Sequence, residues 1–136
     1  MIATTIEQSK HLLELGLDPK TADMFYFSYG MFRPMKLHVG KILEDVVTGK
    51  RQWAIPAWSL SALLEVMPSN IKADEMQYYH HLEKSNGFYT VSYYFDDVDE
   101  LYTLNTTKVC DDPVTAAYEM VCWLLEQGLI KKGGEE

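Results

Sequence analysis

The dipeptide Asn86-Gly87 constrains the fold most, because it separates two runs of residues rich in aromatic and β-branched side chains. A type I′ reversal needs positive φ at both of its central residues, and Asn-Gly is a favoured pair for it. We therefore predict a β-hairpin that pairs residues 75–84 with residues 88–96. In this register Ser85 faces Phe88, which fixes every other cross-strand pair and sorts alternate side chains to opposite faces.

The two faces of this hairpin differ in character. One face is predicted to be apolar and to meet the core; it carries Tyr78, His80, Leu82, Val91, Tyr93 and Phe95. The other has the mixed composition of a solvent-facing sheet surface. Four of its residues are our candidate binding residues: Tyr79, His81, Ser92 and Tyr94. Residues 101–108 are predicted to add a third strand.

Three helices are predicted from caps and apolar spacing. Thr4 and Glu7 have capping-box spacing, and Gly16 fits the left-handed end of a helix over residues 5–15. Ser59 is the expected N-cap of a helix over residues 60–67, which Pro68 ends. The last helix is expected to begin after Asp112 with proline at its first position and to close at Gly128.

These elements predict an α+β fold, in which an antiparallel β-meander of at least three strands is packed on one face by about three helices. We expect residues 1–136 to form one domain, with residues 130–136 as a frayed tail. Residues 22–29 are predicted to be a buried strand, with a short helix as the alternative, and residues 36–39 a short strand. Residues 41–50 remain unassigned, and Pro56 places Ile55 in an extended conformation.

Charge is unevenly placed along the 136 residues. The formal net charge is −8, all of it in residues 69–136, where a phosphate backbone would be repelled. Nucleic acid is therefore a disfavoured partner. The first residues lack the pattern of an export signal, and no apolar run reaches the ~18 residues of a membrane span. We expect a cytoplasmic protein without membrane contact, in which Cys110 and Cys122 are buried thiols.

Few residues have spacings that point to catalysis. Because neighbours in a strand point to opposite faces, His80 and His81 cannot easily share one metal ion. Asp96, Asp97 and Asp99 could supply oxygen ligands to Mg²⁺ or Ca²⁺, but they lack the ligand spacing of an EF-hand, and a solvated acidic turn explains them more simply. We predict no cofactor and assign no catalytic residue.

Two stretches carry a resemblance to known proteins: residues 55–65, with the sequence IPAWSLSALLE, and residues 112–126. Together with residues 5–16, which bring the likeness to between a quarter and a third of the chain, they resemble small uncharacterised bacterial proteins of the prophage or mobile-element type. The resemblance implies an accessory role in a mobile element and carries over no activity.

Two functional hypotheses follow. The first is a non-catalytic binding or accessory protein that engages a protein partner, or another copy of itself, through the aromatic side of the hairpin. The second is a small metal-assisted hydrolase or small-ligand-binding domain, with His81 and the acidic turn near a cleft.

Overall fold

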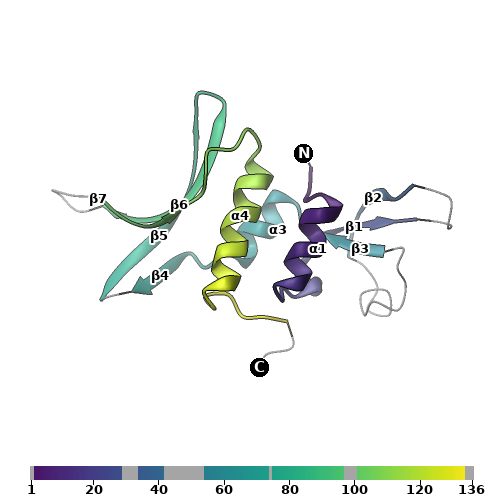
Figure 1. Cartoon of the computed structure of the whole chain (residues 1–136), viewed down its shortest axis with the longest axis horizontal. Coiled ribbons are helices and arrows are strands. Elements are labelled where there is room, and N and C mark those ends of the chain that lie inside the picture. Colours follow the sequence, from purple (N-terminus) through teal and green to yellow (C-terminus); the bar gives the residue numbers. More distant parts are fainter. Residues whose placement is uncertain (1, 29–33, 42–53, 74, 97–100, 134–136) are drawn as a thin grey trace.

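The computed structural model describes residues 2–28, 34–41, 54–73, 75–96 and 101–133 (Figure 1). These residues form helices and two antiparallel sheets, which confirms the predicted α+β fold. The helical elements are α1 (Ile6–Glu14), the 3-10 turn η1 (Pro19–Thr21), α3 (Leu60–Val66) and α4 (Pro113–Glu126). The strands are β1 (Met24–Phe27), β2 (Lys36–Val39), β3 (Ala54–Ala57), β4 (Asn70–Ala73), β5 (Met76–Ser85), β6 (Phe88–Asp96) and β7 (Leu101–Thr106).

The helices lie between the two sheets (Figure 1). Strands β4, β5, β6 and β7 form the larger sheet in that order, and β2, β1 and β3 form the smaller one. Helix α4 contacts β6 on one side and α3 on the other, whereas α1 contacts β3 and α4. One face of the predicted meander is therefore packed by helices, and its other face points away from them.

The hairpin has the predicted register from Ser85–Phe88 to Tyr79–Tyr94. Asn86 and Gly87 have φ values of 53° and 80°, the positive values that a type I′ reversal requires. The predicted pair of Tyr78 and Phe95 lies beyond the end of this ladder. Strand β7 adds to β6 with a register shift at Tyr93 and Tyr94.

The predicted cap of α1 is wrong by one residue. Thr5 is the N-cap: its hydroxyl accepts from the Gln8 amide at 3.1 Å, and the Gln8 side chain accepts from the Thr5 amide at 3.0 Å. Thr4 and Glu7 are separated by three positions, as are Thr5 and Gln8, so the capping-box pattern in the sequence fits both pairs. Burial decides between them, because Thr4 is fully enclosed in the core.

The other two helices begin as predicted; α3 ends at Val66, one residue before the expected end, and α4 ends at Glu126, shortly before Gly128. Ser59 caps α3, and its hydroxyl accepts from the Ala62 amide at 3.2 Å. Asp112 caps α4 ahead of Pro113 and accepts from the Val114 amide at 3.3 Å.

The main core gathers around α3 and α4. Trp58, which immediately precedes the cap of α3, is 0% exposed, and its indole Nε1 donates to Thr21 Oγ1 at 2.9 Å. Side chains from the helices and the larger sheet pack with it, among them Leu12, Leu63, Val91, Tyr93, Met120, Val121, Leu124 and Leu125. The helices therefore supply the apolar side chains that cover one face of the larger sheet, and they connect it to the smaller sheet.

The smaller sheet was only partly anticipated. Strands β1 and β2 confirm the two expected strands, although only Met24 of β1 is buried, and β1 also pairs with β3, which contains Pro56. Strand β4 was missed, since its four residues give too short a pattern to assign. Of the unassigned residues 41–50, only Lys41 lies within the described part of the chain.

The expected fraying from residue 130 onward is wrong for residues 130–133. Ile130 is only 9% exposed and belongs to the core cluster, and the Gly133 amide donates to the Gly16 carbonyl at 2.8 Å. Gly16 has a φ of 99°, which lets the chain leave α1 and approach Lys132 closely. The segment after α4 therefore packs along the end of α1.

Candidate functional site

The four candidate binding residues lie on one side of the larger sheet. Tyr79 pairs directly with Tyr94, and His81 pairs with Ser92, so all four point to the same face. We call this side of strands β4 to β7 the open face. The alternate residues Tyr78, Val91 and Tyr93 are buried on the opposite side, against the helices.

Aromatic rings form the centre of the open face. Tyr79 is 47% exposed, and the ring of His81 stacks on that of Tyr94, with centroids 3.6 Å apart and planes 12° from parallel. Stacked rings on neighbouring strands hold one another in place, so this part of the face is ordered before any contact is made.

Ser92 is placed differently from our expectation. It points to the open face but is only 7% exposed, because β5 and β7 flank it with His81 and Thr106. A small side chain between larger neighbours offers little surface to a partner. Ser92 therefore supports the rings around it, and the exposed area belongs to the tyrosines.

His80 and His81 point to opposite faces, as predicted. The half-buried His80 ring lies against Tyr93, with centroids 5.4 Å apart, and no described residue is a hydrogen-bond partner of its Nε2. Burial, reinforced by the neighbouring His81, lowers the pKa of His80 below its ordinary value of 6.5. The two imidazoles therefore do not converge on one site.

The acidic turn lies largely outside the described residues. Asp97 and Asp99 are not among them, and of Asp96 only the backbone is described, as the last residue of β6. Elsewhere in the described part of the chain, no group of three or more His, Cys, Asp or Glu side chains could hold a metal ion.

The two cysteines are free thiols; Cys122 is buried as predicted, whereas Cys110 is only partly buried. Burial raises the pKa of Cys122 to about 11, and burial together with Glu119 raises the pKa of Cys110. The thiolate is the nucleophilic form, so neither environment activates a cysteine at neutral pH.

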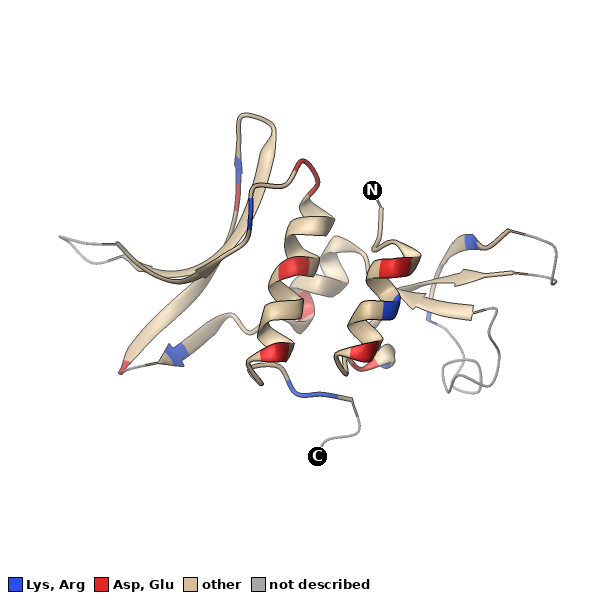
Figure 2. Ribbon diagram, viewed as in Figure 1, with Lys and Arg blue, Asp and Glu red and all other residues tan. Residues whose placement is uncertain are grey.

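Charged residues are sparse on the strands of the larger sheet, whereas many acidic side chains lie on the helices (Figure 2). Strand β4 adds Asn70 and Lys72 to the open face, because they pair with Tyr79 and Gln77. These two residues escaped sequence reasoning, because the alternation in Asn70-Ile71-Lys72-Ala73 is that of a half-buried strand but covers only four residues.

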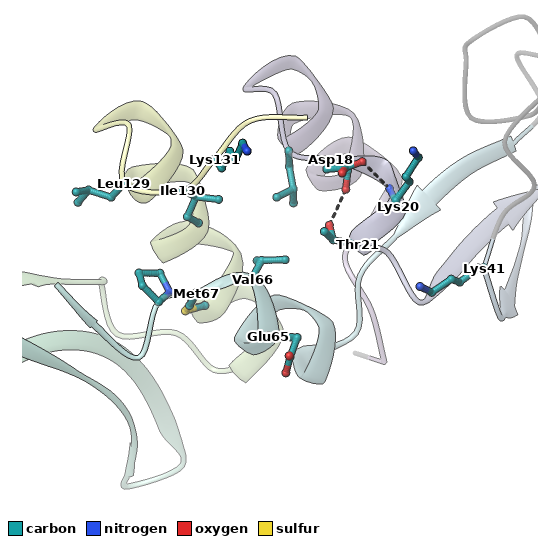
Figure 3. A pocket seen from close by; sticks show the side chains of 12 residues that line it. Asp18, Lys20, Thr21, Lys41, Glu65, Val66, Met67, Leu129, Ile130 and Lys131 are labelled. Atoms are coloured by element: carbon teal, nitrogen blue, oxygen red, sulfur yellow. Dashed lines mark hydrogen bonds between the residues drawn. The ribbon is translucent and has the colours of Figure 1, made fainter. Parts of the chain in front are cut away.

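A second candidate site is a cavity of about 600 Å³ between the C-terminal end of α3 and the segments that follow α1 and α4, which no sequence pattern indicated (Figure 3). Apolar side chains from three separate segments line its interior: Leu17, Val66, Met67, Pro68, Leu129 and Ile130. Charged residues also line it, namely Asp18, Lys20, Lys41, Glu65 and Lys131. The Asp18 side chain is already engaged, since it caps η1 by accepting from the Lys20 amide at 3.0 Å.

Comparison of the chain with models of protein families, with curated proteins and with solved structures found no match. Among the described residues, no helix is both long enough and apolar enough to cross a membrane.

Proposed function

We propose that this chain is a non-catalytic binding protein that engages a protein partner through the open face of its larger sheet. The observation that carries the proposal is the exposed aromatic centre of that face, where Tyr79 lies beside the stacked rings of His81 and Tyr94. The resemblance to proteins of mobile elements suggests an accessory role, and that part of the proposal depends on the resemblance alone.

Physical considerations favour a protein partner. Tyrosine provides a large contact area with only two side-chain torsions to fix, and aromatic residues are enriched where interfaces are most tightly packed. Rings that are already ordered lose little entropy on binding. The net charge of −8 and the scarcity of Lys and Arg on the larger sheet make a phosphate backbone a poor fit.

The proposal predicts that Tyr79→Ala and Tyr94→Ala weaken association strongly and stability little. Tyr79 is about half exposed and both residues lie on the side away from the core, so each substitution should lower the free energy of unfolding by about 1 kcal/mol or less. Urea denaturation measures this loss. Unfolding of both variants would instead assign these rings to the core.

Association can be tested without knowing the partner. A photo-crosslinking phenylalanine analogue at position 79, introduced in the cell that makes the protein, should form a covalent adduct with another protein chain. The same analogue at Glu126, an exposed residue of α4, serves as the control and should form none. The adduct from position 79 should disappear when Tyr94→Ala is added. Absence of any adduct at position 79 would contradict the proposal.

The cavity supports a second candidate function, the binding of a small anion with an apolar tail. Its interior is apolar, and Figure 3 shows Lys41 and Lys131 on different sides of it. Three lysines against two carboxylates make the lining locally positive in a chain whose net charge is −8. Pockets with an apolar interior and a few charged groups at fixed places are typical of small-molecule sites.

This second candidate predicts that octanoate stabilises the protein and that octanol does so much less. At ten times its Kd, a single bound ligand adds about 1.4 kcal/mol, which raises the melting temperature of a chain of this size by about 5 °C. Lys41→Gln combined with Lys131→Gln should abolish the shift in thermal unfolding. Lys10→Gln combined with Lys108→Gln, a matched change of charge outside the cavity, should leave the shift intact.

A further inference from the structure

We infer that the partner of the open face is a second copy of this chain, packed face to face about a two-fold axis that runs perpendicular to the strands. This inference rests on the proposed function and makes it more specific. It depends on how charged and aromatic side chains are ordered along the open face.

The order can be followed along β5. Its open-face residues are Gln77, Tyr79, His81, Glu83 and Ser85, in that sequence. Lys72 of β4 pairs with Gln77 and so lies at the same level as that residue. An exposed cation therefore lies at the level of Gln77, an exposed anion lies toward the hairpin tip, one pair short of Ser85 and Phe88, and the aromatic centre lies midway between the two charges.

The remaining described side chains of the face are uncharged or aromatic. Lys72 and Glu83 supply the only Lys, Arg, Asp or Glu side chains among the open-face strand residues whose side chains are described. Their neighbours there are Asn70, Gln77, Tyr79, His81, Ser85, Phe88, Thr90, Ser92, Tyr94, Thr103 and Thr106. Positive charge therefore lies toward one end of the strands and negative charge toward the other. In a stable dimer of this face, the two opposite charges should come close to each other.

A two-fold axis that lies in the plane of the interface, perpendicular to the strands and at the level between Tyr79 and His81, brings the opposite charges of two copies together. Such an axis reverses strand direction in the second copy, so the level of Lys72 in one copy meets the level of Glu83 in the other. Strands β4 and β5 are neighbours about 4.8 Å apart, a sideways offset that two long side chains can span. Symmetry repeats the contact, so two such pairs flank the aromatic centre.

A two-fold axis parallel to the strands does not bring the opposite charges together. A two-fold parallel to the strands keeps every residue at its own level, so Lys72 would meet the level of Gln77 and Glu83 the level of Thr90. Aligned packing of sheets, with strand directions within about 30° of each other, is compatible with the reversed arrangement. Charge complementarity therefore selects a second copy in the reversed orientation.

A charge exchange tests this arrangement. Sedimentation equilibrium at about 0.15 M salt, where charges more than ~8 Å apart are largely screened, measures the dissociation constant of the dimer. Lys72→Glu or Glu83→Lys alone should raise that constant about tenfold or more, because each creates two like-charge contacts per dimer. The double variant K72E/E83K should return it to within about threefold of the parent. Lys108→Glu, an equal change of charge at an exposed residue beyond β7, should have little effect.

Each outcome is decisive. Rescue by the double variant supports the reversed dimer. A monomeric parent chain at all concentrations overturns the second copy as partner, while the photo-crosslink from position 79 to a different protein would still support the proposed function. Dissociation by Tyr79→Ala without rescue by the double variant overturns the reversed orientation and leaves the open face as the interface.

Discussion

Trp58→Ala is expected to lower the free energy of unfolding by ~3–5 kcal/mol, as other large aromatic truncations in protein cores do. The Trp58 side chain is completely buried where α3 begins, and its indole Nε1 donates to Thr21 Oγ1 at 2.9 Å. Its removal leaves a cavity in the core between α1, α3 and α4, which surrounding side chains can fill only in part.

Urea denaturation followed by circular dichroism measures this loss. Phe88→Ala provides the control, because Phe88 is also aromatic but is 48% exposed near the tip of the hairpin, and its loss should cost about 1 kcal/mol or less. A loss below ~1 kcal/mol for Trp58→Ala would mean that the residue is at the surface and would contradict the packing of α3.

Thr4→Val is expected to be the second most destabilising change, lowering the free energy of unfolding by about 2–3 kcal/mol. Valine keeps the shape of threonine but removes a buried hydroxyl that contacts two groups. The Trp58 amide donates to Thr4 Oγ1 at 3.1 Å, and Thr4 Oγ1 and Ser9 Oγ share a hydrogen bond at 2.8 Å. Both groups would lose this partner inside the core.

A double-mutant cycle identifies the cause of that loss. Adding Ser9→Ala to Thr4→Val should cost less than Ser9→Ala alone, since the serine hydroxyl has already lost its partner. Thr5→Val, which removes the N-cap next to Thr4, should cost about 1 kcal/mol and serves as the comparison. Equal losses at positions 4 and 5 would contradict a special role for the buried hydroxyl.

The candidate site was predictable where it depends on the hairpin and not where it depends on other segments. The register followed from Asn86-Gly87, so the common face of Tyr79, His81 and Tyr94 followed as well. The burial of Ser92 did not, because Thr106 reaches it from β7, and the register shift between β6 and β7 has no signature in the sequence. The cavity also escaped prediction, since its lining comes from four segments that are distant in the sequence.

Local chemistry along the sequence determined the type I′ reversal, the alternation of faces it imposes, and the ends of α3 and α4, because each depends on residues a few positions apart. Tertiary structure alone decided that Thr5 rather than Thr4 caps α1, that β1 pairs with β3, and that Ile130 is buried after α4. In each of these cases the free energy comes from burial against a segment far away in the sequence, which no local pattern encodes.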